Sequence, residues 1–66
     1  MQIFNVQGMS CDHCVKAIVQ AVRAKDPAAS VRVDLGAKEV GVQSSLSVDE
    51  VIDVISAEGY EVKLAS

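Results

Sequence analysis

The chain has 66 residues, half of them apolar, so it is long enough for one domain and too apolar to be disordered. Nine acidic residues against six basic ones give a net charge of −3, which argues against a nucleic-acid partner, because nucleic acid attracts basic surfaces. No apolar run is long enough to span a bilayer, and the first residues lack the features of a secretory signal, so we predict a cytoplasmic protein without membrane insertion.

The first third of the chain passes from a strand pattern to a helix pattern. Phe4 and Val6 are two residues apart, which is typical of a strand with one buried face. A loop follows over residues 7–13. Pro27 predicts that the helix after this loop ends by Asp26, because a proline disfavours helical geometry in the residue before it. The apolar positions of this helix have the amphipathic i, i+3, i+4, i+7 spacing: Val15, Ile18, Val19 and Val22.

Two further strands and a second helix come next. Period-two stretches over 31–35 and 40–42 flank Gly36, which predicts a hairpin. Ser47 and Glu50 have the spacing of a helix-capping box, and the apolar positions after Ser47 again have helical spacing.

The last elements complete a doubled strand-helix-strand pattern. Gly59 is a natural stop for the second helix, and a final period-two stretch covers 60–64. We therefore predict an α+β fold, the ferredoxin-like βαββαβ sandwich, with two helices on a four-stranded antiparallel sheet and one domain over residues 1–66. The loop over 7–13 is longer than its counterpart over 44–47, and loops longer than a fold requires tend to carry function.

Both cysteines of the chain lie in that loop or directly after it. Residues 8–14 read Gly8-Met9-Ser10-Cys11-Asp12-His13-Cys14. A cysteine pair with this spacing is typical of a redox dithiol, of half a zinc site or of a low-coordinate site for a soft metal. At the start of a helix, unpaired N–H groups and the helix dipole stabilise a thiolate, which is the better ligand and nucleophile. The structural alternative, two small buried hydrophobes, fits poorly with a polar loop.

The number of ligands favours copper. A structural zinc site takes four ligands, whereas the chain offers two cysteines and one histidine, His13. Cu(I) is satisfied by two thiolates in near-linear geometry. A thioredoxin-type redox site is the alternative in which the dithiol reacts, but no tryptophan or proline stands beside the cysteines.

Residues 8–14 resemble the G-M-x-C-x-x-C signature of the heavy-metal-associated domain, and their Met-Ser-Cys-x-His-Cys form is especially similar to small bacterial copper chaperones. The predicted βαββαβ order and the Gly59-Tyr60 pair also match, so the resemblance covers essentially the whole chain. The chain departs from the family at residues 28–30, where Ala-Ala-Ser stands in place of a common Gly-Val pair. The stretch between the first helix and the second strand is also one residue shorter.

This resemblance implies that Cys11 and Cys14 bind Cu(I). Met9 would pack beneath the loop, and we favour this core role over direct ligation. Tyr60 would approach the site from the loop before the last strand, either supporting the metal site or acting as plain core. His13 is either a third ligand, a pH-sensitive neighbour of the thiolates or a solvated residue, and we favour the solvated residue because two thiolates already satisfy Cu(I).

By the same resemblance the protein is a carrier and not an enzyme: a cytoplasmic copper(I) chaperone. It would deliver Cu(I) by thiolate exchange to the metal-binding domain of a copper-transporting P-type ATPase. Lys16 and Arg23 lie on one polar stripe of the first helix, which we predict to dock the partner through complementary charge. We interpret the acidic second helix as a solvated face. The sequence leaves open whether copper bridges two copies into a homodimer.

Three alternatives remain at this stage. The same fold could handle mercury, zinc or cadmium, or the chain could be a module of a larger ATPase. Against the module, the pattern of strands begins close to Met1 and ends close to Ser66, as expected of a complete chain. A small dithiol oxidoreductase is the enzymatic alternative.

Overall fold

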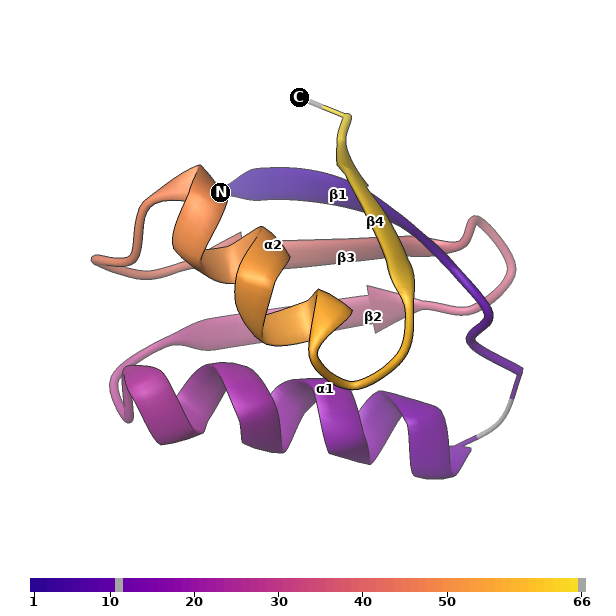
Figure 1. Ribbon diagram of the computed structural model, residues 1–66, viewed down its shortest axis with the longest axis horizontal. Helices are drawn as coiled ribbons and strands as arrows, with labels where there is room; N and C mark the ends of the chain where they lie inside the picture. Colours follow the sequence, from indigo (N-terminus) through magenta and orange to yellow (C-terminus); the bar gives the residue numbers. More distant parts are fainter. Residues whose placement is uncertain (11, 66) are drawn as a thin grey trace.

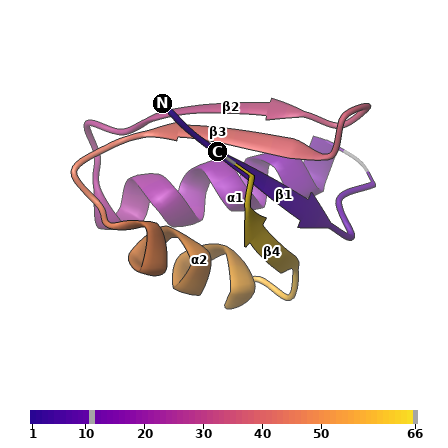
Figure 2. The ribbon, with the colours of Figure 1, turned by 90° about the horizontal axis from the view of Figure 1, so that it is seen from above.

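The computed structural model describes residues 1–10 and 12–65. The strands form one antiparallel sheet in the order β2-β3-β1-β4. Both helices lie on the same face of this sheet (Figures 1 and 2). The predicted ferredoxin-like arrangement of two helices on four antiparallel strands is confirmed. In chain order the elements are β1 (Gln2–Gln7), α1 (Asp12–Lys25), β2 (Ser30–Asp34), β3 (Glu39–Gln43), α2 (Val48–Ser56) and β4 (Glu61–Leu64).

A row of apolar residues crosses all four strands and accounts for their register. Val33 lies opposite Val40, Val40 opposite Phe4, and Phe4 opposite Leu64. A shift of one residue would turn this row to the other face, so burial of one face fixes the register. Phe4 and Val40 are completely buried, and a fully buried side chain of this kind contributes about 1.5–3 kcal/mol. The other buried apolar residues are Val6, Met9, Ile18, Val22, Ala29, Val42, Val51 and Ile55.

The helix ends follow local signals. In the capping box of α2, the Glu50 N–H donates to Ser47 Oγ (3.2 Å), and the Ser47 N–H donates to the Glu50 carboxylate (3.1 Å), as the sequence predicts. This helix ends at Ser56, and Gly59 has a φ of +96° in the turn that follows it. None of the described helices has the length and apolar character needed to cross a membrane.

The predicted loop over 7–13 was too long, because β1 includes Gln7 and α1 begins at Asp12. Two predicted strand ends were wrong by one residue. β2 ends at Asp34, so Leu35 belongs to the hairpin connection, where Asp34 Oδ1 accepts a hydrogen bond from the Ala37 N–H (3.0 Å). β4 begins at Glu61, so Tyr60 precedes the strand. In both cases an apolar side chain contacts the core from a turn, and the period-two pattern cannot distinguish such a residue from the end of a strand.

Asp26 joins the connection after α1 to the connection before α2. One carboxylate oxygen accepts hydrogen bonds from the N–H (3.1 Å) and the hydroxyl (3.2 Å) of Ser45, and the other accepts from the Ala28 N–H (3.1 Å). The hydrogen bonds from the backbone of Ser45 and of Ala28 lower the pKa of the Asp26 carboxyl, because they stabilise its charged form. Two segments 19 residues apart are thereby held together.

We predict that Asp26→Asn lowers the free energy of unfolding near neutral pH. A carboxyl whose pKa is lowered by folding stabilises the fold above its ordinary pKa of 3.8, and this contribution is lost as the pH falls through the folded-state value. The difference in the free energy of unfolding between the parent and Asp26→Asn should therefore disappear in acid. Urea unfolding near neutral pH and at about pH 2 measures it, with Asp53→Asn on the exposed face of α2 as the matched control. If this difference were the same at both pH values, the ionised Asp26 carboxylate would not be the group that stabilises the two connections.

Candidate metal-binding site

The connection between β1 and α1 lies at an end of the sheet where two other connections also lie. β1 runs antiparallel to both β3 and β4, so its last residues meet the start of each. The Val6 N–H donates to the Lys38 carbonyl (2.9 Å) in the β2–β3 hairpin, and Gln7 pairs with Glu61 at the start of β4. The described residues 8–10, 35–38 and 57–60 of these connections therefore gather at one end of the molecule (Figure 1).

Cys14 is the third residue of α1, in its first turn. Its side chain is half-buried and packs against the hydrophobic core. The N-terminus of α1 points its first N–H groups toward this end of the molecule, where they favour negative charge. Cys11, the other predicted ligand, lies outside the described residues, so its assignment rests on the sequence. No three His, Cys, Asp or Glu side chains within residues 1–10 and 12–65 are grouped so that they could hold a metal ion.

Met9 fixes this connection to the core. Its side chain is only 8 % exposed and belongs to the cluster that contains Phe4 and Ile18. Burial of an unbranched thioether suits the irregular space at the end of a sheet, because methionine adapts to such gaps. The structure therefore places Met9 beneath the connection.

Tyr60 packs against the same connection from the turn before β4. Gly8 has a φ of +100°, and a Cβ atom built on it would lie 3.3 Å from Tyr60 Cδ1. The half-buried ring of Tyr60 thus contacts the backbone of Gly8 from the turn before β4. Sequence reasoning assigned no role to Gly8. Its position directly after a strand and before the cysteine pair was the signal that could have indicated one.

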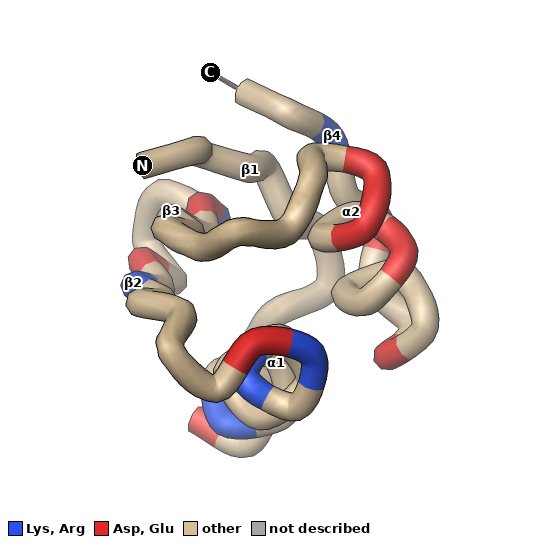
Figure 3. The backbone as a smooth tube through the Cα atoms, turned by 90° about the vertical axis from the view of Figure 1, so that its left-hand side faces the viewer, with Lys and Arg blue, Asp and Glu red and all other residues tan. Residues whose placement is uncertain are grey.

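The two helices carry different charged side chains. His13, Lys16 and Arg23 are exposed on α1. The first turn of α2 carries Asp49 and Glu50, and its last turn has no basic residue. Figure 3 shows both basic and acidic positions on and beside α1, and acidic positions along α2. The structure therefore brings Met9, Cys14 and Tyr60 to one end of the core and leaves the three polar α1 residues at the surface.

Comparison with known proteins agrees with this geometry. The family model described as the heavy-metal-associated domain matches residues 3–61. The chain is 37% identical over 65 residues to the copper chaperone CopZ of Staphylococcus haemolyticus, covering 94% of this chain and 96% of that protein. It is 42% identical over 60 residues to the copper chaperone CopZ of Bacillus subtilis, covering 86% and 87%. Among solved structures, the copper chaperone Atx1 from Synechocystis PCC6803 superposes with a TM-score of 0.89 at 33% identity, covering 92% and 97%.

We predict that Gly8→Ala destabilises the fold by about 1 to 2 kcal/mol, because an L side chain is strained at positive φ and the new methyl group would press on the Tyr60 ring. Urea unfolding measures the loss, and the NMR signals of the single tyrosine report the displaced ring. Gly36→Ala is the matched control, because a Cβ there would lie 3.4 Å from Asp34 Oδ1 and its φ is not positive. Equal stability of the two variants would show that the Gly8–Tyr60 contact imposes no constraint.

Proposed function

The chain belongs to the heavy-metal-associated domain family, and we propose from this that it is a cytoplasmic copper(I) chaperone and not an enzyme. The observation that carries the proposal is the cysteine pair beside an anchored connection: Cys14 lies in the first turn of α1, and Cys11 stands three residues before it. Relatives at 37% and 42% identity over most of the chain are copper chaperones, which supports copper as the cargo.

We propose that Cys11 and Cys14 hold Cu(I) as a pair of thiolates. Two thiolates and one Cu(I) carry a net charge of −1, which the N-terminus of α1 favours through its unpaired N–H groups. Two-coordinate Cu(I) leaves room for a third ligand. The site would therefore bind copper firmly and still admit a thiolate from another protein.

Transfer would proceed by ligand exchange without redox chemistry. A thiolate of the partner forms a Cu–S bond, and one Cu–S bond to this chain then breaks. The partner's thiol has given up its proton, the released sulfur takes one up, and copper stays Cu(I) throughout. A second exchange of the same kind completes the transfer, so no free ion is released.

The neighbours of the cysteines would have supporting roles. Met9, buried in the core, would hold the connection at a fixed height above the sheet. Tyr60, in contact with Gly8, would cover one side of the connection. His13 is exposed at the second position of α1, which supports a solvated residue over a third ligand.

The proposed partner is the metal-binding domain of a copper-transporting P-type ATPase. Lys16 and Arg23 are exposed on the helix that begins at the cysteine pair, so an acidic face of the partner would meet them as the two sites approach. A copper-bridged homodimer would use the same exchange chemistry between two copies. We propose that residues 1–66 form a single heavy-metal-associated domain.

We predict that Cys11→Ser and Cys14→Ser each abolish Cu(I) binding in competition with a chelator, because one remaining soft ligand cannot retain the ion. Anaerobic titration followed by mass spectrometry of the complex measures stoichiometry and affinity, and one Cu(I) per monomer is expected. His13→Ala is the control and should bind like the parent.

Two outcomes would contradict this site. Retention of copper by Cys14→Ser would disprove the ligand assignment. An unfolded metal-free protein in far-UV circular dichroism would indicate a structural metal site instead of a carrier, since the core of this chain is assembled from the sheet and helices. Insulin reductase activity would favour the oxidoreductase alternative.

We also predict that Lys16→Ala/Arg23→Ala slows copper transfer to the ATPase domain by about tenfold at low salt, because surface charges act chiefly on the association rate. Copper affinity should stay unchanged. Transfer rates measured over a range of ionic strength should show a weaker salt dependence for the variant. Lys25→Ala/Lys63→Ala removes the same charge but leaves Lys16 and Arg23 in place, and it is the matched control. Equal effects of the two double variants would assign the change to net charge alone.

A further inference from the structure

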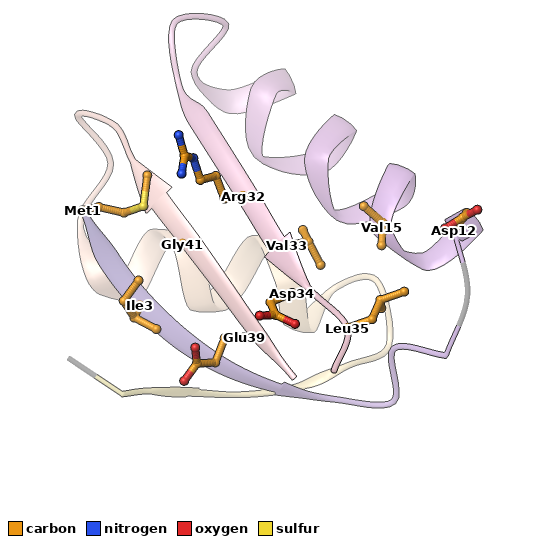
Figure 4. Close-up of a pocket in the computed structure, with 10 residues that line it drawn as sticks. All are labelled: Met1, Ile3, Asp12, Val15, Arg32, Val33, Asp34, Leu35, Glu39 and Gly41. Carbon is orange, nitrogen blue, oxygen red and sulfur yellow. The ribbon is translucent and has the colours of Figure 1, made fainter. Parts of the chain in front are cut away.

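β2 forms one edge of the sheet. It pairs with β3 on one side, and no strand of residues 1–10 and 12–65 lies on its other side. An open groove of about 570 Å³ runs past this edge (Figure 4). The unpaired N–H and C=O groups of an edge strand can accept another strand, and proteins often protect such edges for that reason. The residues of the groove at this edge are Asp12, Val15, Arg32, Val33, Asp34 and Leu35.

The two sides of β2 differ in chemistry. Val33 and Leu35 lie on the side of α1, next to Val15, and all three are half-buried (Figure 4). Arg32 and Asp34 lie on the other side, and both are exposed. A strand added at this edge would therefore need apolar side chains toward α1 and charged side chains on the open face.

Neither charge is compensated by its neighbour across the sheet. Asp34 lies directly opposite Glu39 on β3, and like charges in this position are destabilising. Arg32 lies opposite Gly41, which has no side chain to pair with it. In Figure 4 Arg32 extends toward Met1 and away from Glu39. An added strand that offered a cation to Asp34 and an anion to Arg32 would compensate both.

We propose that this edge binds β2 of a second copy of the chain, as an antiparallel two-fold pair centred on Val33. In this register Arg32 of each copy faces Asp34 of the other, so two ion pairs form on the open face. Val33 faces Val33, and Val31 faces Leu35, so the half-buried apolar residues of both copies contact each other. The two-fold axis makes the contact self-complementary and closed, so it stops at a dimer.

The backbone and the charges select this register over its neighbours. In this register the numbers of two facing residues differ by an even number. Residues two apart in a strand point their N–H and C=O groups to the same side, so the outward-pointing groups of one copy meet the outward-pointing groups of the other. A shift by one residue on each strand would centre the pair on Arg32 and place the two Arg32 side chains against each other. Repulsion between like charges disfavours that register.

This dimer leaves both candidate metal sites accessible. Cys14 and the connection that precedes α1 lie at the end of the sheet where β2 finishes. Because the paired strands run in opposite directions, the two sites lie at opposite ends of the joined sheet. Copper does not take part, so the pairing is independent of the proposed function.

The test uses the metal-free, reduced full chain in the presence of a chelator. Sedimentation velocity over a range of concentrations should show a weak monomer–dimer equilibrium. Arg32→Asp and Asp34→Lys should each weaken dimerisation by about tenfold or more, because each turns both ion pairs into repulsive pairs. An equimolar mixture of the two variants should restore the dimer, because the acidic chain then faces the basic one. Circular dichroism of each variant confirms that it is folded, which matters for Asp34→Lys because Asp34 also accepts a hydrogen bond from Ala37.

Three results would overturn the proposal. The first is a monomer at every concentration. The second is a dimer whose two variants fail to recover on mixing although both are folded. The third is a set of concentration-dependent NMR shifts that maps to β4 or to the cysteine connection instead of β2. Lys63→Asp, a charge reversal on the opposite edge strand, is the matched control and should leave the dimer unchanged.

Discussion

The burial of Met9 is the contact on which the candidate site depends. The connection between β1 and α1 has no regular hydrogen-bonding pattern of its own, so a side chain must attach it to the rest of the molecule. Met9 does this by entering the same core as Phe4 and Ile18. Both ends of the connection are also fixed by β1 and α1, so Met9 adds a third attachment between them.

The topology also places the candidate site at the end of the sheet, where three connections meet. The antiparallel order brings the hairpin, the turn before β4 and the connection after β1 to one end of the sheet. Tyr60 reaches the backbone of Gly8 across this end. This end can meet another protein directly, which suits a carrier that hands over its cargo by exchange of ligands.

Charge is arranged by element, and each region points to a different contact. α1 carries Lys16 in the turn after Cys14 and Arg23 in its last turn, whereas α2 is acidic. The edge strand β2 carries one charge of each sign on the same face, which makes it complementary to itself. A partner that transfers copper and a second copy of the chain would therefore use separate surfaces, so the two contacts do not compete.

The sequence by itself determined the elements, the fold class and the cysteine pair. Apolar spacing marked both helices, the capping box of Ser47 and Glu50 marked the start of α2, and the motif named Cys11 and Cys14, because each of these signals is local. Only the tertiary structure decided the contacts between distant segments. Tyr60 packs on Gly8, Asp26 binds Ser45, and Asp34 faces Glu39 across a hairpin whose register is fixed by the buried face of the sheet. Such contacts depend on the packing of the whole chain, and no short stretch of sequence carries a signal for them.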